Sequence, residues 1–218
     1  MGRPIGFLGS LRLGDRFITV DRELERVGAG VVPVFDANVA ELPLESGNWR
    51  RRFTARFDKA ESGSGPVGQW ALHAFLDSLE AFFTGLEDDT AALGWVGDEE
   101  RAAEVTVGGA AGTNVILTVD DLAPLDLALS DYVYFSGGAW GSVNVLGAAP
   151  PHTLRVAELS AAVAMGETCY RAWRVYPACR VLGFSPGEMP EESQDGFRLD
   201  CSLRLDSKEA PVRSTAWS

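Results

Sequence analysis

The sequence predicts an α+β fold in which a curved antiparallel sheet, built of hairpins, is covered by two amphipathic helices. Three observations support this prediction. Short segments with alternating apolar and polar residues recur along the chain, as in strands that bury one face. Glycine-rich turns separate several of these segments. Two longer stretches instead repeat their apolar residues every three or four positions, as one face of a helix does.

Strand-like segments dominate the first sixty residues. Residues 17–20 and 31–35 are rich in β-branched and aromatic side chains, which favour extended structure. In residues 52–58, polar and apolar side chains alternate strictly, so we expect a strand with one buried face and one exposed face. These three segments predict the beginning of the sheet.

The clearest helix begins after the glycine- and serine-rich residues 62–65. Pro66 suits the first helical turn, because the backbone N–H that proline lacks would have no partner there. Apolar side chains then follow one helical face: Leu72, Phe75, Leu76, Leu79, Phe82, Phe83 and Leu86. Gly85 and the acidic residues after it predict the end of the helix. We expect the apolar face to pack against the sheet.

Two hairpins follow this helix. Residues 104–107 and 113–119 flank a glycine-rich turn, and each segment places its valines on one face of a strand. Residues 132–135 and 143–146 flank a second glycine-rich turn in the same way. Both pairs predict antiparallel neighbours in the sheet.

The last third of the chain is less regular. Residues 154–163 fit either a strand or a helix, whereas residues 161–176 predict a second helix that ends at Pro177. The buried side of that helix would carry Met165, Cys169, Trp173 and Tyr176. Residues 197–206 alternate cleanly and predict a final strand. We expect a single α+β domain over residues 1–206, followed by a loose tail over residues 207–218.

Composition places the chain among soluble globular proteins. It has 218 residues, of which 46% are hydrophobic and 23% are charged. A run of about 18 apolar residues that could span a membrane is missing, and so is the apolar core of a signal peptide. The three cysteines, Cys169, Cys179 and Cys201, are too few and odd in number for a secreted disulfide framework. We therefore expect a cytoplasmic protein that binds no membrane.

The net charge of −12 is concentrated in the middle of the chain. Residues 61–132 hold one arginine against fourteen acidic residues, a net charge of −13. Such a charge repels a phosphate backbone, so we do not expect nucleic-acid binding. Clustered acids form either a solvated surface or a docking surface for a basic protein. The candidate partner-binding residues are Glu87, Asp88, Asp89, Asp98, Glu99, Glu100, Asp120 and Asp121, with Trp95 as an aromatic anchor.

The sequence contains no clear catalytic, metal or cofactor motif. Its two histidines, His73 and His152, accompany no nucleophile elbow, and the cysteines do not have the spacing of a zinc site. The glycine-rich residues 108–112 join two predicted strands, whereas a dinucleotide fingerprint needs a helix after it. We therefore expect no metal or cofactor, and a binding protein rather than an enzyme.

Several short motifs occur in a characteristic order. Residues 34–39, VFDANV, lead through the predicted strand at 52–58 into a helix of Leu-x-x-Leu type, and the late predicted helix is followed by Tyr176-Pro177-Ala178-Cys179-Arg180. This order resembles the small immunity proteins of bacterial contact-dependent toxin systems, the WapI-type family in particular. The segment at 94–97, GWVG, is also similar to small uncharacterised actinobacterial domains. The first resemblance covers about residues 34–180 and implies a non-enzymatic protein that binds and blocks a toxin.

The leading hypothesis is a cytoplasmic binding protein that docks a basic protein partner, such as a toxin, through its acidic face, as an immunity or antitoxin factor does. The alternative is a small-molecule-binding protein or a cofactor-free enzyme, with an apolar aromatic pocket beneath a curved sheet. A pocket containing Tyr134, Trp140 or His152 would favour the alternative, and a filled core would favour binding by the surface. Self-association is compatible with the same features.

Overall fold

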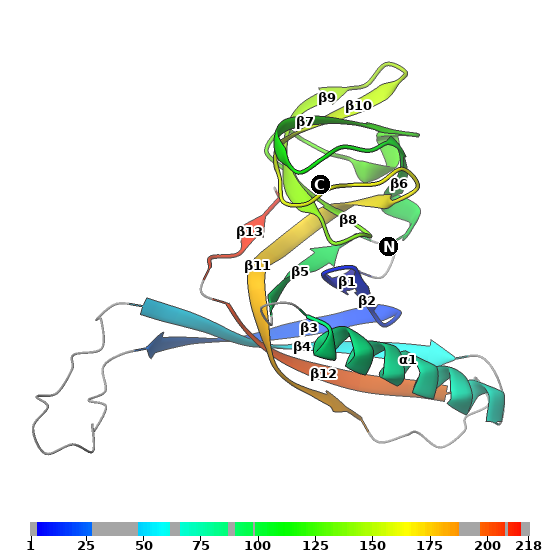
Figure 1. Cartoon of the computed structure of the whole chain (residues 1–218), viewed down its shortest axis with the longest axis vertical. Coiled ribbons are helices and arrows are strands. Elements are labelled where there is room, and N and C mark those ends of the chain that lie inside the picture. Colours follow the sequence, from blue (N-terminus) through cyan, green and yellow to red (C-terminus); the bar gives the residue numbers. More distant parts are fainter. Residues whose placement is uncertain are drawn as a thin grey trace, which may run out of the picture.

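One long strand joins the two parts of the molecule. The computed structural model describes residues 4–27, 48–61, 66–86, 90–97, 99–187, 197–207 and 209–214, and for residues 16–27, 48–51 and 61 it describes the backbone alone. Strand β11 (Thr168–Pro186) begins in a closed barrel and continues into an open sheet (Figure 1). The fold is therefore a barrel and a sheet that share one strand.

Six antiparallel strands close the barrel in the order β11-β6-β7-β10-β9-β8, with β8 pairing again with β11. The other five are β6 (Ala102–Val107), β7 (Gly112–Val119), β8 (Tyr132–Phe135), β9 (Trp140–Gly147) and β10 (His152–Leu159). Cys169 marks the closure, because it pairs with Ala103 of β6 on one side and with Phe135 of β8 on the other. Both hairpins predicted from the sequence are confirmed as β6–β7 and β8–β9.

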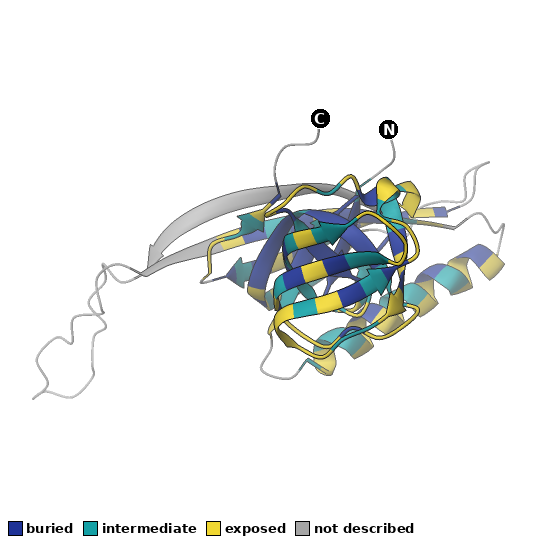
Figure 2. Cartoon of the chain, turned by 90° about the horizontal axis from the view of Figure 1, so that it is seen from above, coloured by how far each residue is buried: buried dark blue, intermediate teal, exposed yellow. Residues whose placement is uncertain are grey.

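Alternation along the strands fills the barrel with apolar side chains. Figure 2 shows buried and exposed residues following one another along the barrel strands. The buried residues include Val105, Leu117, Val133, Val143, Leu154 and Val156. Since each strand turns one side chain in two toward the interior, the alternating pattern in the sequence predicts which residues form this core.

The open sheet has the order β3-β4-β12-β11-β5-β1-β2, and all its pairs are antiparallel. Its strands besides β11 are β1 (Ile5–Leu8), β2 (Leu11–Leu13), β3 (Arg16–Val27), β4 (Asn48–Glu61), β5 (Thr90–Val96) and β12 (Phe197–Ser207). The predicted strands at 17–20, 52–58 and 197–206 are confirmed, whereas the predicted strand at 31–35 lies outside the described residues. Strands β1 and β2 were not predicted from the sequence.

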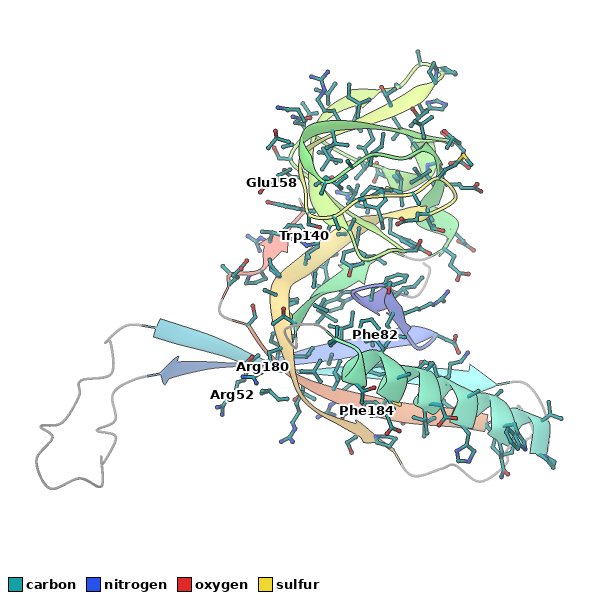
Figure 3. All side chains as sticks on the ribbon, viewed as in Figure 1. Arg52, Phe82, Trp140, Glu158, Arg180 and Phe184 are labelled. Atoms are coloured by element: carbon teal, nitrogen blue, oxygen red, sulfur yellow. The ribbon has the colours of Figure 1, made fainter. Side chains whose placement is uncertain are left out.

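Helix α1 (Pro66–Thr84) confirms the helix predicted after the glycine- and serine-rich segment. It lies across one face of the open sheet, over β4 and β12 (Figure 1). Leu72 and Leu79 are fully buried, and Phe82 and Phe184 lie between α1 and the sheet (Figure 3). The apolar residues at helical spacing therefore pack against the sheet, as predicted.

The second predicted helix, at 161–176, is wrong. Residues 160–167 form a loop in which Val163 makes a single bridge to Gly109, and β11 begins at Thr168. The spacing of four between Met165, Cys169 and Trp173 only imitates a helix, and Met165 is 77% exposed. Residues 169–172 are buried on both faces, so this strand lacks the alternation by which a half-exposed strand is recognised.

The described residues therefore form a mostly β protein with one α-helix and a closed barrel, not a curved sheet under two helices. Residues 154–159, which fitted either a strand or a helix, belong to β10. Beyond residue 207, for which we expected a loose tail, Val212–Arg213 form β13 and pair with β11. The hydroxyl of Ser214 donates to the carbonyl of Ala172 at 2.5 Å and accepts from the N–H of Tyr132 at 2.8 Å.

Candidate functional site

Two short 3-10 turns bring the candidate acidic residues together. Turn η2 (Glu99–Arg101) precedes β6, and turn η3 (Ala123–Leu125) follows β7. The two turns contact each other, and η3 also contacts β6. Glu99 and Glu100 lie in η2, while Asp120 and Asp121 lie between β7 and η3. Four of the eight acids proposed from the sequence therefore share one region of the barrel surface.

Asp120 and Asp121 also hold the local backbone in place. The carboxylate of Asp120 accepts hydrogen bonds from the N–H groups of Glu104 and Asp121, each at 2.8 Å. The carboxylate of Asp121 accepts from the N–H of Ala123, the first residue of η3, at 2.9 Å. These bonds satisfy backbone donors that would otherwise face only solvent. The two aspartates are therefore exposed and held in fixed positions.

Glu99 and Glu100 differ in their surroundings. Glu99 forms an ion pair with Arg12 of β2, which links the hairpin of β1 and β2 to η2. Glu100 is exposed. Glu104 is also exposed and lies beside Asp120, but sequence reasoning missed it because it stands alone within a strand. We call Glu99, Glu100, Glu104, Asp120 and Asp121 together the acidic face.

Five further candidates were proposed from the sequence, and the structure describes one of them, Trp95. Glu87, Asp88, Asp89 and Asp98 lie outside the described residues. Trp95, the proposed aromatic anchor, lies on β5 and packs edge-on against Trp173 with ring centroids 4.3 Å apart. Its ring is half-buried and also contacts the core between α1 and the open sheet. The contacts of the Trp95 ring in the structure are therefore those of a residue that packs within its own chain.

A buried ion pair supports the barrel beside the acidic face. Arg171 donates to the carboxylate of Asp131 at 2.9 Å, and both side chains are almost fully buried. Arg171 also donates to the backbone carbonyl of Asp126 at 2.6 Å. Asp131 in turn accepts from the N–H of Ala128 at 2.9 Å. This network fixes the loop from η3 to β8, which follows in the chain after the segment that carries Asp120 and Asp121.

The residues named for an aromatic pocket occupy different environments. Tyr134 is fully buried, and its hydroxyl donates to the carbonyls of Gly9 and Ala92. Burial raises the pKa of this hydroxyl well above its ordinary value. Trp140 and His152 are half-buried on β9 and β10 (Trp140 in Figure 3). A hollow of about 440 Å³ lies elsewhere, on the open sheet, and it is lined by Thr54, Arg56, Ser185, Gly187, Asp200, Cys201 and Ser202.

The cysteines have the environment of core residues. All three are buried and carry free thiols. Burial raises the pKa of the Cys179 thiol to about 12 and that of Cys201 to about 11. A nucleophilic cysteine needs the opposite shift, toward the thiolate. Within the described ranges, no group of three His, Cys, Asp or Glu side chains has the arrangement of a metal site.

Among the described residues, no helix has the length and continuous apolar character that crossing a bilayer requires. Comparison with protein-family models, curated proteins and solved structures yields no match to this chain.

Proposed function

We propose that this protein is a binding protein that docks a basic surface of a protein partner through its acidic face. The observation that carries the proposal is the convergence of Glu99, Glu100, Asp120 and Asp121 on two contacting turns of one barrel. These residues are separated by about twenty positions in the sequence. Clustered charge of one sign accelerates association with an oppositely charged partner and disfavours wrong partners.

Rigidity supports this proposal. The carboxylates of Asp120 and Asp121 are held by backbone hydrogen bonds, and the loop after η3 is fixed by the pair of Arg171 and Asp131. A prearranged surface loses little conformational freedom when a partner binds, so more of the interaction energy contributes to affinity. A solvated surface that served only solubility would gain nothing from such fixation.

The immunity-factor form of the proposal adds that the partner is a basic toxin. This addition comes from the resemblance of the sequence motifs to the immunity proteins. The late helix that formed part of that resemblance is replaced in the structure by strand β11. For the alternative, a small-molecule site, the relevant finding is that apolar side chains fill the barrel and that Tyr134 is enclosed by its neighbours. Docking by the surface agrees better with this packing.

The test is a capture experiment with matched charge reversals. The wild-type chain and the variant Glu100→Arg/Glu104→Arg are immobilised and exposed to a lysate of the source organism. The proteins that they retain are then eluted with a salt gradient. Neither residue carries the backbone bonds that Asp120 and Asp121 do. The control, Asp77→Arg/Glu80→Arg, makes the same change of charge on exposed positions of α1.

We expect the wild-type chain and the α1 control to retain one basic protein in stoichiometric amount. The acidic-face variant should bind it at least tenfold more weakly, because attraction at the contact becomes repulsion. Elution at moderate salt is expected, since ions screen charges on a surface. Equal retention of the same partner by all three chains would refute docking through the acidic face.

A further inference from the structure

Arg174, in the middle of β11, is a buried cation with which no carboxylate of the described residues forms an ion pair. The residue is only 9% exposed. Its Nη1 donates to the hydroxyl of Tyr176 at 3.4 Å, and its guanidinium carbon lies 5.3 Å from the centre of the Trp173 ring. Buried charges are normally paired, as Arg171 is with Asp131, because a buried charge loses its hydration. Arg174 therefore lacks the expected anion among the described residues.

A second arginine lies directly opposite the first. In the pairing of β11 with β13, Arg213 is the partner of Arg174, and on the other edge of β11 the partner is Trp95 of β5. Residues in opposite positions share one side of the sheet, with Cβ atoms about 5 Å apart. Arg213 is exposed, and it too forms no ion pair with a described residue. Like charges in opposite positions repel, so the two arginines destabilise the chain unless an anion lies beside them.

The described positions around the two arginines bring no carboxylate to them. On the same side of the sheet, the positions two residues along the chain or one strand farther are uncharged: Gly6, Leu93, Tyr176 and Pro211. Glu209 lies between β12 and β13, but it is exposed and forms an ion pair with neither arginine. The positive charge of this pair is therefore not balanced within the described part of the chain.

The acids of β3 occupy positions on the other side of the sheet. Phe53 of β4 packs against Tyr176, with ring centroids 4.6 Å apart, and so lies on the side of Arg174. Glu23 of β3 pairs with Arg52, the neighbour of Phe53 in the chain, and neighbours in a strand face opposite sides. The other two acids of β3 follow Glu23 at a spacing of two and share its side: Asp21 and Glu25.

The backbone at Trp173 positions the buried guanidinium. The register of β11 with β5 shifts between Ala172 and Arg174, which marks an irregularity of the strand at Trp173. Such irregularities turn side chains in new directions and are frequent beside functional sites. Trp173 is held in turn by its edge-on contact with Trp95. The guanidinium is thus fixed by a ring and one hydrogen bond, while most of its five N–H donors have no acceptor among the described residues.

We infer that Arg174 and Arg213 form a binding site for a phosphate group. Two guanidinium groups supply two positive charges, which match a phosphate dianion, whereas a carboxylate balances only one. The planar fork of N–H donors on each guanidinium also suits a pair of phosphate oxygens. The site belongs to β11 and β13, whereas the acidic face belongs to η2, β6 and the segment before η3, so this inference goes beyond the proposed function.

The net charge of the chain makes such a site easy to recognise. At −12, the molecule repels anions in general. Saturable binding of one phosphate per chain therefore requires a local group of cations that overcomes this repulsion.

Isothermal titration calorimetry with inorganic phosphate, on the full chain in Tris-chloride buffer, tests the inference. The decisive variant is Arg213→Gln, because this side chain is exposed and its loss leaves the core intact. Arg174→Met removes the buried guanidinium. The matched control is Arg155→Gln, which removes an exposed strand arginine from the barrel. Methyl phosphate and acetate are titrated in parallel, and circular dichroism verifies that each variant is folded.

We expect the wild-type chain and Arg155→Gln to bind one phosphate per chain with equal affinity. Arg213→Gln should bind phosphate at least about tenfold more weakly, because a charge-assisted contact is lost. Arg174→Met should show no binding, since the guanidinium that lacks a partner is gone. Acetate should bind more weakly than phosphate, because it carries a single charge.

Three results would overturn the inference: no saturable binding of phosphate to the wild-type chain, acetate binding as tight as phosphate binding, or unchanged phosphate binding by Arg213→Gln. If phosphate binds as expected, the comparison with methyl phosphate names its source. Tighter binding of methyl phosphate indicates a phosphate ester, and tighter binding of inorganic phosphate indicates the free anion. None of these measurements involves Glu100 or Glu104, so docking through the acidic face stands or fails separately.

Discussion

At the scale of single residues, the pair of Arg171 and Asp131 shows how charge is accommodated inside this β protein. Both side chains lie where the barrel meets the open sheet, and each also bonds to the backbone of the loop after η3. A charge buried without its partner costs several kcal/mol, so neither residue tolerates the loss of the other. The pair of Arg12 and Glu99, by contrast, is largely exposed to water.

We therefore predict that Arg171→Met lowers the free energy of unfolding by about 3 kcal/mol or more, because Asp131 is left buried without its guanidinium. Arg12→Met removes an exposed pair and should cost less than about 1 kcal/mol. Urea denaturation followed by circular dichroism measures both. Similar losses of unfolding free energy for the two variants would show that the buried pair contributes no more to stability than the exposed pair.

At the scale of elements, α1 packs against one face of the open sheet and leaves its other side in solvent. Its buried leucines, Leu72 and Leu79, follow helical spacing, whereas Val67 and Trp70 near its beginning are 73% and 76% exposed. Burial of an apolar side chain contributes stability roughly in proportion to the area removed from water. The contribution of the helix should therefore depend on its inner residues alone.

Leu79→Ala is predicted to lower the free energy of unfolding by about 2–5 kcal/mol, the range for a buried leucine that leaves a cavity. Val67→Ala, on the same helix, should change it by less than about 0.5 kcal/mol. Chemical denaturation of the two variants in parallel is the measurement. A comparable loss for Val67→Ala would mean that the outer face of α1 is covered in solution.

At the scale of the whole molecule, β11 couples the barrel to the open sheet. Its first residues pair with β6 and β8, its middle pairs with β5, and its end pairs with β12. Unfolding of either part would remove a partner strand from the other. We therefore expect the two parts to unfold together, as a single cooperative unit.

This coupling can be measured by hydrogen exchange under conditions where global unfolding limits the rate. Leu117→Ala, which opens a cavity in the barrel, should accelerate exchange in β4 and β12 as much as in β7 and β10. Val107→Ala, at a barrel position that is 56% exposed, is the matched control and should leave both regions nearly unchanged. Acceleration confined to the barrel strands would show that barrel and sheet are independent.

The candidate surfaces could be predicted from the sequence only in part. Glu99, Glu100, Asp120 and Asp121 were recognisable as clusters, because neighbours in the chain remain neighbours in space. Glu104 was missed, since it joins them only through its pairing with the loop at Asp120.

The sequence by itself determined the location of the acidic charge, helix α1, both hairpins and the alternating strand β12, because each depends on interactions between residues close in the chain. Only the tertiary structure decided that residues 168–176 are a strand and that the barrel closes. Residues 169–172 are enclosed on both faces, which removes the alternation that identifies a half-exposed strand. Closure requires Cys169 to pair with Ala103 and Phe135 together, and no local pattern specifies two partners so far away in the chain.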